Sequence, residues 1–354
     1  MQYSSNVVEL LKKLSNAHGI SGYEDEIREI IKDELKDFVD KIEIDPLGNI
    51  FCVKKGDSDY KIMLAAHMDE IGFMVKYIDD KGYLRIVPIG GWFEQTVLSQ
   101  RVILHGSKGK VYGVIGCKPP HLMKDEERKK VIKIEDMFVD IGASSKDEVL
   151  EMGVNIGTPV TIDRKVVILG KNKITGKAFD DRVGIAVMIE ALKQTKSNAT
   201  IYAVGTVQEE VGLKGARTSA FAISPNVAIA IDVCTATDHP GTESAYLDIK
   251  LGNGPAIAIA ESSGRGLITT KKVFEWLKRT AEENKIPYQL EVTERGMSDA
   301  AIIYLTKSGI PTGTISVPAR YIHTPVEVID IRDLENSVAL TARAMETAEK
   351  YLSH

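Results

Sequence analysis

Residues 60–69 read YKIMLAAHMD, a run of apolar residues that is interrupted at its end by two polar ones, His67 and Asp69. The apolar part has the length of a single β-strand, and its residues do not alternate between apolar and polar. A continuous apolar run of this length is typical of a strand that is covered on both faces. The segment therefore predicts a strand at the interior of a layered fold.

Helices and strands alternate on the C-terminal side of this segment. Helical patterns occupy 180–195, 270–286 and 331–352, and strand patterns occupy 200–210, 226–236 and 311–325. Two further helices are expected within residues 1–40. This alternation predicts an α/β fold with a mostly parallel or mixed sheet that is flanked by helices.

Residues 71–163 have a different character. Short β-type runs such as GFMVKYI and GKVYGVIG are separated by turns that contain glycine, and only 145–153 has a helical pattern. These features predict a small all-β unit, either a barrel or a sandwich. His67 and Asp180 are 113 positions apart (180 − 67), and this unit fills nearly the whole gap.

If His67 and Asp180 belong to one site, the β-rich unit must be an insertion that leaves the α/β domain and returns to it. We therefore expect a discontinuous α/β domain, made of residues 1–69 and 164–354, and an inserted domain of residues 70–163.

Composition and charge narrow the classes of partner. The 354 residues carry a formal net charge of −5 and no block of Lys and Arg with interleaved aromatic residues, so we expect no binding to nucleic acid. No apolar run approaches the roughly 20 residues that span a membrane, and the amphipathic N-terminus does not resemble a signal peptide. Cys52, Cys117 and Cys234 form no CxxC pair, which favours reduced thiols in a cytoplasmic protein.

Acidic residues and histidines follow the predicted strands. Ligands of open α/β sheets bind beyond the carboxyl ends of the strands. The residues expected there are His67, Asp69, Glu209, Glu210, Asp232 and His323, with Asp180 and Asp181 at the start of a helix. Each one alone has an ordinary interpretation as a helix cap, a turn residue, a buried histidine or a solvated strand end. Several of them interrupt apolar runs, where unpaired charges are costly, and together they form the ligand set of a Zn, Co or Mn site.

Six segments give the chain a resemblance to a known family. The segments AAHMDEIGFMV, GVIGCKPPH, GKAFDDRVG, VQEEVGLKGA, AIDV and RYIHTPVEV resemble the tetrahedral (TET) metallo-aminopeptidases, which include deblocking and glutamyl or leucyl aminopeptidases. The resemblance implies a peptidase domain that removes N-terminal residues from peptides and binds two divalent metal ions per subunit, Zn or Co with Mn as a further candidate. It also implies that the inserted domain forms dimers, from which a hollow dodecamer is built.

The resemblance also implies a role for each residue of the site. Five residues would ligate the metals, with Asp180 shared between the pair His67 and Asp232 and the pair Glu210 and His323. Glu209 would be the general base, and Asp69 would orient the imidazole of His67. The Asp180–Asp181 peptide would be cis.

Different roles for Glu209 and Glu210 require a turn in the backbone, because neighbouring residues on an extended chain point in opposite directions. Gly212 and Gly215 are placed to allow this turn. Cys234 lies two residues after Asp232, and we expect it to be a small buried hydrophobe and not a thiolate ligand.

Two residues and three functions stay open at this point. His239 is expected in an exposed loop, and Asp299 is either a carboxylate on the substrate side or a helix cap. The nearest alternative function is another two-metal amidohydrolase on the same scaffold, a deacylase or a carboxypeptidase. A second alternative is a glycosidase, which would use a pair of carboxylates without metal. A third is an assembly or binding protein that hydrolyses no substrate.

Overall fold

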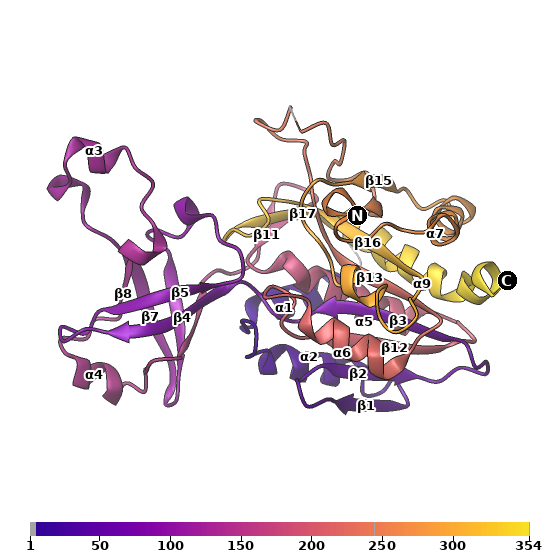
Figure 1. Ribbon diagram of the computed structural model, residues 1–354, viewed down its shortest axis with the longest axis horizontal. Helices are drawn as coiled ribbons and strands as arrows, with labels where there is room; N and C mark the ends of the chain where they lie inside the picture. The colour runs from indigo at the N-terminus through magenta and orange to yellow at the C-terminus, as the bar shows by residue number, and fades with distance from the viewer. Residues whose placement is uncertain (1–4, 244, 354) are drawn as a thin grey trace.

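The structure is a computed structural model, and it describes residues 5–243 and 245–353 (Figure 1). The α-helices within these residues are α1 (Ser5–Asn16), α2 (Asp25–Leu35), α3 (Asp125–Arg128), α4 (Lys146–Glu151), α5 (Phe179–Gln194), α6 (Lys214–Ile223), α7 (Lys271–Glu283), α8 (Ala300–Ile303) and α9 (Ile331–Leu352). The strands are β1 (Lys41–Ile44), β2 (Ile50–Lys54), β3 (Lys61–His67), β4 (Gly72–Ile78), β5 (Leu84–Ile89), β6 (Arg101–Gly106), β7 (Gly109–Gly116), β8 (Phe138–Asp140), β9 (Pro159–Ile162), β10 (Val167–Leu169), β11 (Lys173–Gly176), β12 (Thr200–Thr206), β13 (Val227–Thr235), β14 (Ala256–Ala260), β15 (Gln289–Val292), β16 (Thr312–Arg320) and β17 (Glu327–Asp330).

One large mixed sheet forms the α/β part of the molecule. Its strands follow the order β1-β2-β12-β3-β13-β16-β17-β11-β10, and β14 pairs with β16 and carries β15. The neighbours β12, β3, β13 and β16 are parallel to one another, whereas β1, β2, β17, β11 and β10 pair in antiparallel fashion. The predicted α/β fold with a parallel or mixed sheet is confirmed.

Strand β3 is covered on both faces, as its apolar run predicts. Ile62, Leu64 and Ala66 belong to the core cluster on the side of α1, α2, α5, α7 and α9. Met63 and Ala65 point to the opposite side, where α6 and α8 cover the sheet. Side chains alternate across a strand, so a strand without polar residues needs a helix layer on each face.

Helix α5 lies in the middle of the helix layer on one face. It packs against β3 and β13 of the sheet and against α1 and α9, and its residues from Phe179 to Leu192 are buried. A helix that is covered on all sides carries no polar stripe. The acidic residues at its N-terminus are therefore placed inside the molecule.

The inserted segment forms a closed barrel with the strand order β4-β5-β8-β7-β6-β9, which lies beside the sheet in Figure 1. Closure leaves no unpaired strand edge, and the barrel has its own apolar core, separate from that of the sheet. The sequence predicted helix only at 145–153, but the structure adds α3 and short 3-10 turns. These pieces have three or four residues, which is too short for a periodic pattern.

Two polar contacts join the barrel to residues near the N-terminus. Nδ1 of His18 is 2.8 Å from Oγ1 of Thr161, and Lys110 forms an ion pair with Glu26 at 2.8 Å. The described residues include no helix that is long and apolar enough to cross a membrane.

Candidate metal centre

Parallel strands of the sheet end at one level and bring the predicted site residues together. His67, the last residue of β3, is paired with Thr206, the last residue of β12. Asp232 lies on β13 two residues beyond Ala230, which is the partner of Ala65 on β3. Because the strands share direction and register, their polar ends lie at the same edge of the sheet.

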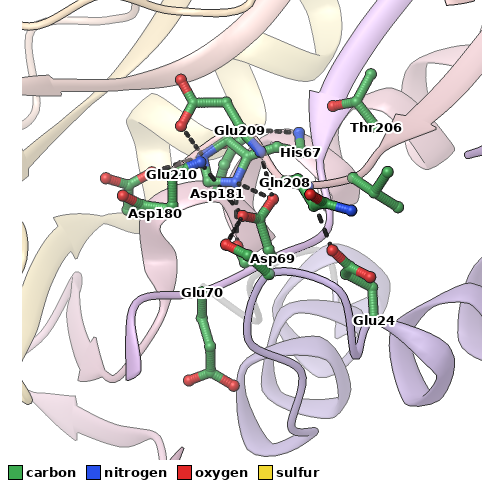
Figure 2. Close-up of polar contacts among 12 residues, drawn as sticks. Glu24, His67, Asp69, Glu70, Asp180, Asp181, Thr206, Gln208, Glu209 and Glu210 are labelled. Atoms are coloured by element: carbon green, nitrogen blue, oxygen red, sulfur yellow. Dashed lines mark hydrogen bonds and ion pairs between the residues drawn. The ribbon is translucent and has the colours of Figure 1, made fainter. Parts of the chain in front are cut away.

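Asp180 is at the centre of the cluster. Its Oδ1 lies 2.9 Å from Nε2 of His67, and its Oδ2 lies 3.2 Å from Nε2 of His323. Nε2 of His323 is also 3.4 Å from Oε1 of Glu210. Figure 2 shows His67, Asp180, Glu209 and Glu210 converging at this point.

Among the described residues, three groups of side chains could each hold a metal ion, and two of them contain Asp180. In the first group, His67, Asp180 and Asp232 offer ligand atoms within 4.8 Å of one another. In the second group, Asp180, Glu210 and His323 do so. The two oxygens of Asp180 face different histidines, which is the geometry that a bridging carboxylate requires.

Buried negative charge is concentrated in this cluster. Burial raises the pKa of Glu209 and Asp232 well above the usual range of a carboxyl group, and neighbouring carboxylates add to the increase. Oε1 of Glu210 is buried and accepts no hydrogen bond from the described residues. A divalent cation would stabilise these carboxylates in their ionised form, so the residues present fit a metal site.

Glu209 lies at the edge of the cluster, with Oε2 at 3.9 Å from Nε2 of His67 and a side chain that is 10% exposed. The backbone turns before it at Gln208, which has a φ of 56°. The sequence placed this turn at Gly212 and Gly215 instead. Gly212 does have a φ of 119°, but Gly215 is required for close packing, since a Cβ there would lie 2.2 Å from Oδ1 of Asn49.

Asp69 binds the main chain of Glu209 and Glu210, whereas the sequence predicted a contact with the imidazole of His67. Its carboxylate accepts the N–H groups of Glu209 and Glu210 at 3.0 and 3.2 Å and the hydroxyl of Ser21 at 2.6 Å. Nδ1 of His67 is 3.0 Å from the main-chain oxygen of Asp69 but 3.5 Å from its carboxylate. The carboxylate of Asp69 therefore fixes mainly the turn that carries Glu209 and Glu210.

Two further buried carboxylates hold the main chain of the cluster. Asp181 accepts the N–H of His67 at 3.1 Å, and the Asp180–Asp181 peptide is cis. Glu327 accepts the N–H groups of Asp180 at 3.1 Å and of His323 at 3.0 Å. Glu327 is the acidic residue in the motif RYIHTPVEV, but it was not among the predicted site residues.

Three residues near the cluster, Cys234, His239 and Asp299, belong to none of the groups that could hold a metal ion among the described residues. Cys234 is buried, as we predicted, and burial raises the pKa of its thiol. His239 is half-buried beside Tyr321, not exposed. Asp299, whose role the sequence left open, stands at the N-cap position of α8 without a side-chain capping bond, and its carboxylate accepts a hydrogen bond from Oγ1 of Thr206 at 2.5 Å.

A cavity of about 810 Å³ opens in front of the cluster. His67, Asp180, Glu209, Asp232 and His323 form its floor. Apolar side chains also line it, and the carboxylates Glu261 and Glu291 and the cation Arg295 complete its walls. The cavity is large enough for the end of a peptide.

A sheet with carboxylates and imidazoles at its carboxyl edge, beside an open cavity, defines the class of metal-dependent hydrolases. The chain matches the M42 glutamyl aminopeptidase family over residues 48–340 and belongs to that family. It is 45% identical to a putative aminopeptidase of Acetivibrio thermocellus over 341 residues, which cover 96% of this chain and 98% of the relative.

Solved structures agree with this assignment. An aminopeptidase from the archaeon Desulfurococcus kamchatkensis is 48% identical and superimposes with a TM-score of 0.93, covering 98% of this chain and 96% of the other. The TET1 peptidase of Pyrococcus horikoshii, which can assemble into a tetrahedron or a large octahedral shell, is 35% identical with a TM-score of 0.87, covering 96% and 98%. The protein is a metal-dependent aminopeptidase, and its resemblance to the TET peptidases is confirmed.

Proposed function

We propose that this aminopeptidase binds two divalent cations per subunit through five side chains. Asp180 is shared, His67 and Asp232 complete the first position, and Glu210 and His323 complete the second. The observation that carries this proposal is the pair of three-residue groups that have Asp180 in common. Oxygen and imidazole ligands suit Zn or Co, and also Mn.

The residues around the two positions have separate tasks. When bound, the two cations lower the pKa of a water molecule and polarise the scissile carbonyl group. Glu209 accepts a proton from the attacking water and donates it to the leaving amine. Asp69 keeps Glu209 in place through the main chain, and the cavity receives the N-terminal residue of the peptide.

A substrate panel with controlled metal content tests this function. Chelator-treated protein should lose hydrolysis of aminoacyl anilides, and Zn, Co or Mn should restore it. N-acyl amino acids should stay intact, because the proposed substrate has a free N-terminus. Faster cleavage of N-acyl amino acids would favour a deacylase, and full activity after complete metal removal would contradict the proposal.

We also propose that residues 70–163 form dimers and that the dimers build a dodecamer. Large apolar side chains are exposed on the inserted segment, among them Tyr112 at 66% and Leu122 at 70%. Burial of such side chains in an interface would remove apolar surface from water. Light scattering should give a mass near 467 kDa (12 × 38.9 kDa), and a monomer of 38.9 kDa at micromolar concentration would contradict the proposal.

The proposed partners are peptides and further copies of this chain, with no nucleic acid or membrane. A cytoplasmic location is part of the same proposal. Its support is the state of the cysteines, because Cys52, Cys117 and Cys234 are all free thiols, as is usual in a reducing compartment.

A further inference from the structure

Glu327 is a buried carboxylate that connects two proposed metal ligands through their main chains. Its exposed fraction is 2%. One oxygen, Oε2, accepts the N–H of Asp180 at 3.1 Å, and the other, Oε1, accepts the N–H of His323 at 3.0 Å. A single side chain therefore links the helix start that carries Asp180 to the loop that carries His323.

The sheet topology explains why Glu327 can reach both segments. It is the first residue of β17, which lies between β16 and β11 in the sheet. Strand β16 leads to His323 three residues after its end, and β11 leads to Asp180 four residues after its end. The carboxylate of Glu327, at the start of β17, thus lies beside the segment that follows β16 and the segment that follows β11.

The segments that follow β11 and β16 both contain residues in the left-handed backbone conformation. Ala178 has a φ of 55°, Tyr321 of 63° and His323 of 60°. This conformation is unfavourable for a residue other than glycine, because its Cβ comes too close to the neighbouring carbonyl oxygen. The segments therefore need contacts from outside to keep these conformations, and the bonds to Glu327 supply such contacts.

The charge of Glu327 has no side-chain counter-ion. Among residues 5–243 and 245–353, no Lys, Arg or His forms an ion pair with it, whereas the buried Glu70 is paired with Lys177 at 2.7 Å. A buried carboxylate without a cation is unfavourable. A cation bound by Asp180 and His323 would favour the ionised form of Glu327.

We propose that Glu327 is a positioning residue that sets the separation of Asp180 and His323 and so maintains the second metal position in particular. This inference rests on the proposed function, which assigns that position to Asp180, Glu210 and His323. The first position depends on Glu327 only through Asp180, because His67 and Asp232 lie on β3 and β13.

The experiment compares Glu327→Gln with a matched control, Asp333→Asn. Asp333 is also a buried carboxylate without an ion pair among the described residues, and it accepts the N–H groups of Gly252 and Gly254 at 2.6 and 2.7 Å, away from the cluster. Each substitution leaves one acceptor oxygen where two main-chain bonds existed. Chelator-treated proteins are titrated with Co²⁺, and binding is followed by visible absorption and calorimetry.

Wild-type protein should bind two equivalents of Co²⁺. In Glu327→Gln one equivalent should bind roughly 10–100-fold more weakly, and the other should stay within about twofold of wild type. Asp333→Asn should bind both equivalents as wild type does. If Glu327→Gln does not give folded protein, Glu327→Asp takes its place, since the shorter side chain keeps the charge but cannot span both N–H groups.

Wild-type binding of both equivalents by the Glu327 variant would overturn the inference. Equal weakening of both equivalents, or the same loss in Asp333→Asn, would also overturn it, because the effect would then be one of general stability. A wild-type protein that binds fewer than two equivalents would refute the proposed two-metal function itself. The wild-type titration thus separates failure of the function from failure of the role of Glu327.

Discussion

Replacement of Glu209 with Gln should abolish most of the turnover while both metals stay bound. The substitution keeps the size of the side chain and the N–H bond to Asp69, which lies 3.0 Å away. General-base catalysis typically contributes 10²–10⁴-fold to a rate. The nearby carboxylates of Asp180, Glu210 and Asp232 belong to the proposed metal positions, so none can act as a substitute base. We therefore expect a loss of about 10³–10⁴-fold in kcat, or roughly 4–5.5 kcal/mol in the activation free energy.

Hydrolysis of an aminoacyl anilide, measured beside the metal content of each protein, tests this prediction. The matched variant is Glu210→Gln, which should retain about one metal per subunit and regain part of its activity in excess Zn or Co. The comparison is discriminating, because Glu209 also lies within 4.8 Å of His67 and Glu210 in a possible ligand group. Loss of metal in Glu209→Gln and retention in Glu210→Gln would reverse the two roles. A decrease of less than about tenfold in both variants would refute the reasoning.

Three further predictions concern a cysteine, a histidine and the metals. Cys234→Ala should keep both metals and most of the activity, and loss of one metal equivalent on analysis would show that the thiol is a ligand. Burial and the charge of Lys177 lower the pKa of His18 to about 2, so His18 stays neutral when folded and gains a proton below pH 6.5 only when unfolded. Its contribution to stability is complete above pH 6.5 and should be lost as the pH falls, by up to about 1.4 kcal/mol per pH unit. Urea unfolding of His18→Asn should therefore show a smaller decrease in the free energy of unfolding between pH 6.5 and 5 than the wild type does. The same pH dependence in both proteins would contradict this prediction. Removal of the metals should lower the unfolding free energy, by about 2.7 kcal/mol for a site held at 100 times its Kd, and equal melting temperatures with and without chelator would count against a structural contribution.

The sequence predicted strand β3 and the alternation of helices and strands after residue 180, but it did not predict the buried strand β2. Strand β3 is apolar at consecutive positions, and such a pattern has few alternatives to a strand between two helix layers. The edge strand β1 escaped prediction, because it has only four residues and three of them are exposed. Short strands of this kind form through pairing with a neighbour, here β2, and their own residues carry little signal.

The identity of the site residues was easier to predict than the way in which they are held. His67 and Asp232 interrupt apolar runs, and this makes them visible in the sequence. The turn at Gln208 could not be found, since a residue other than glycine gives no sign of a positive φ. Glu327 was missed for another reason: its partners are main-chain groups of two segments that only the folded sheet brings beside it.

The position of the barrel in the chain has a consequence for biosynthesis. Strand β3 leaves the ribosome before the barrel, but its neighbours β12 and β13 begin only at Thr200 and Val227. At 5–20 residues per second, the strand waits for roughly 7 seconds or more with its apolar faces uncovered. The barrel, whose strands all lie between Gly72 and Ile162, can complete its hydrogen bonds during this interval. The nascent chain thus carries a finished domain beside an aggregation-prone strand, and the second proposed metal position is complete only after His323 has been added.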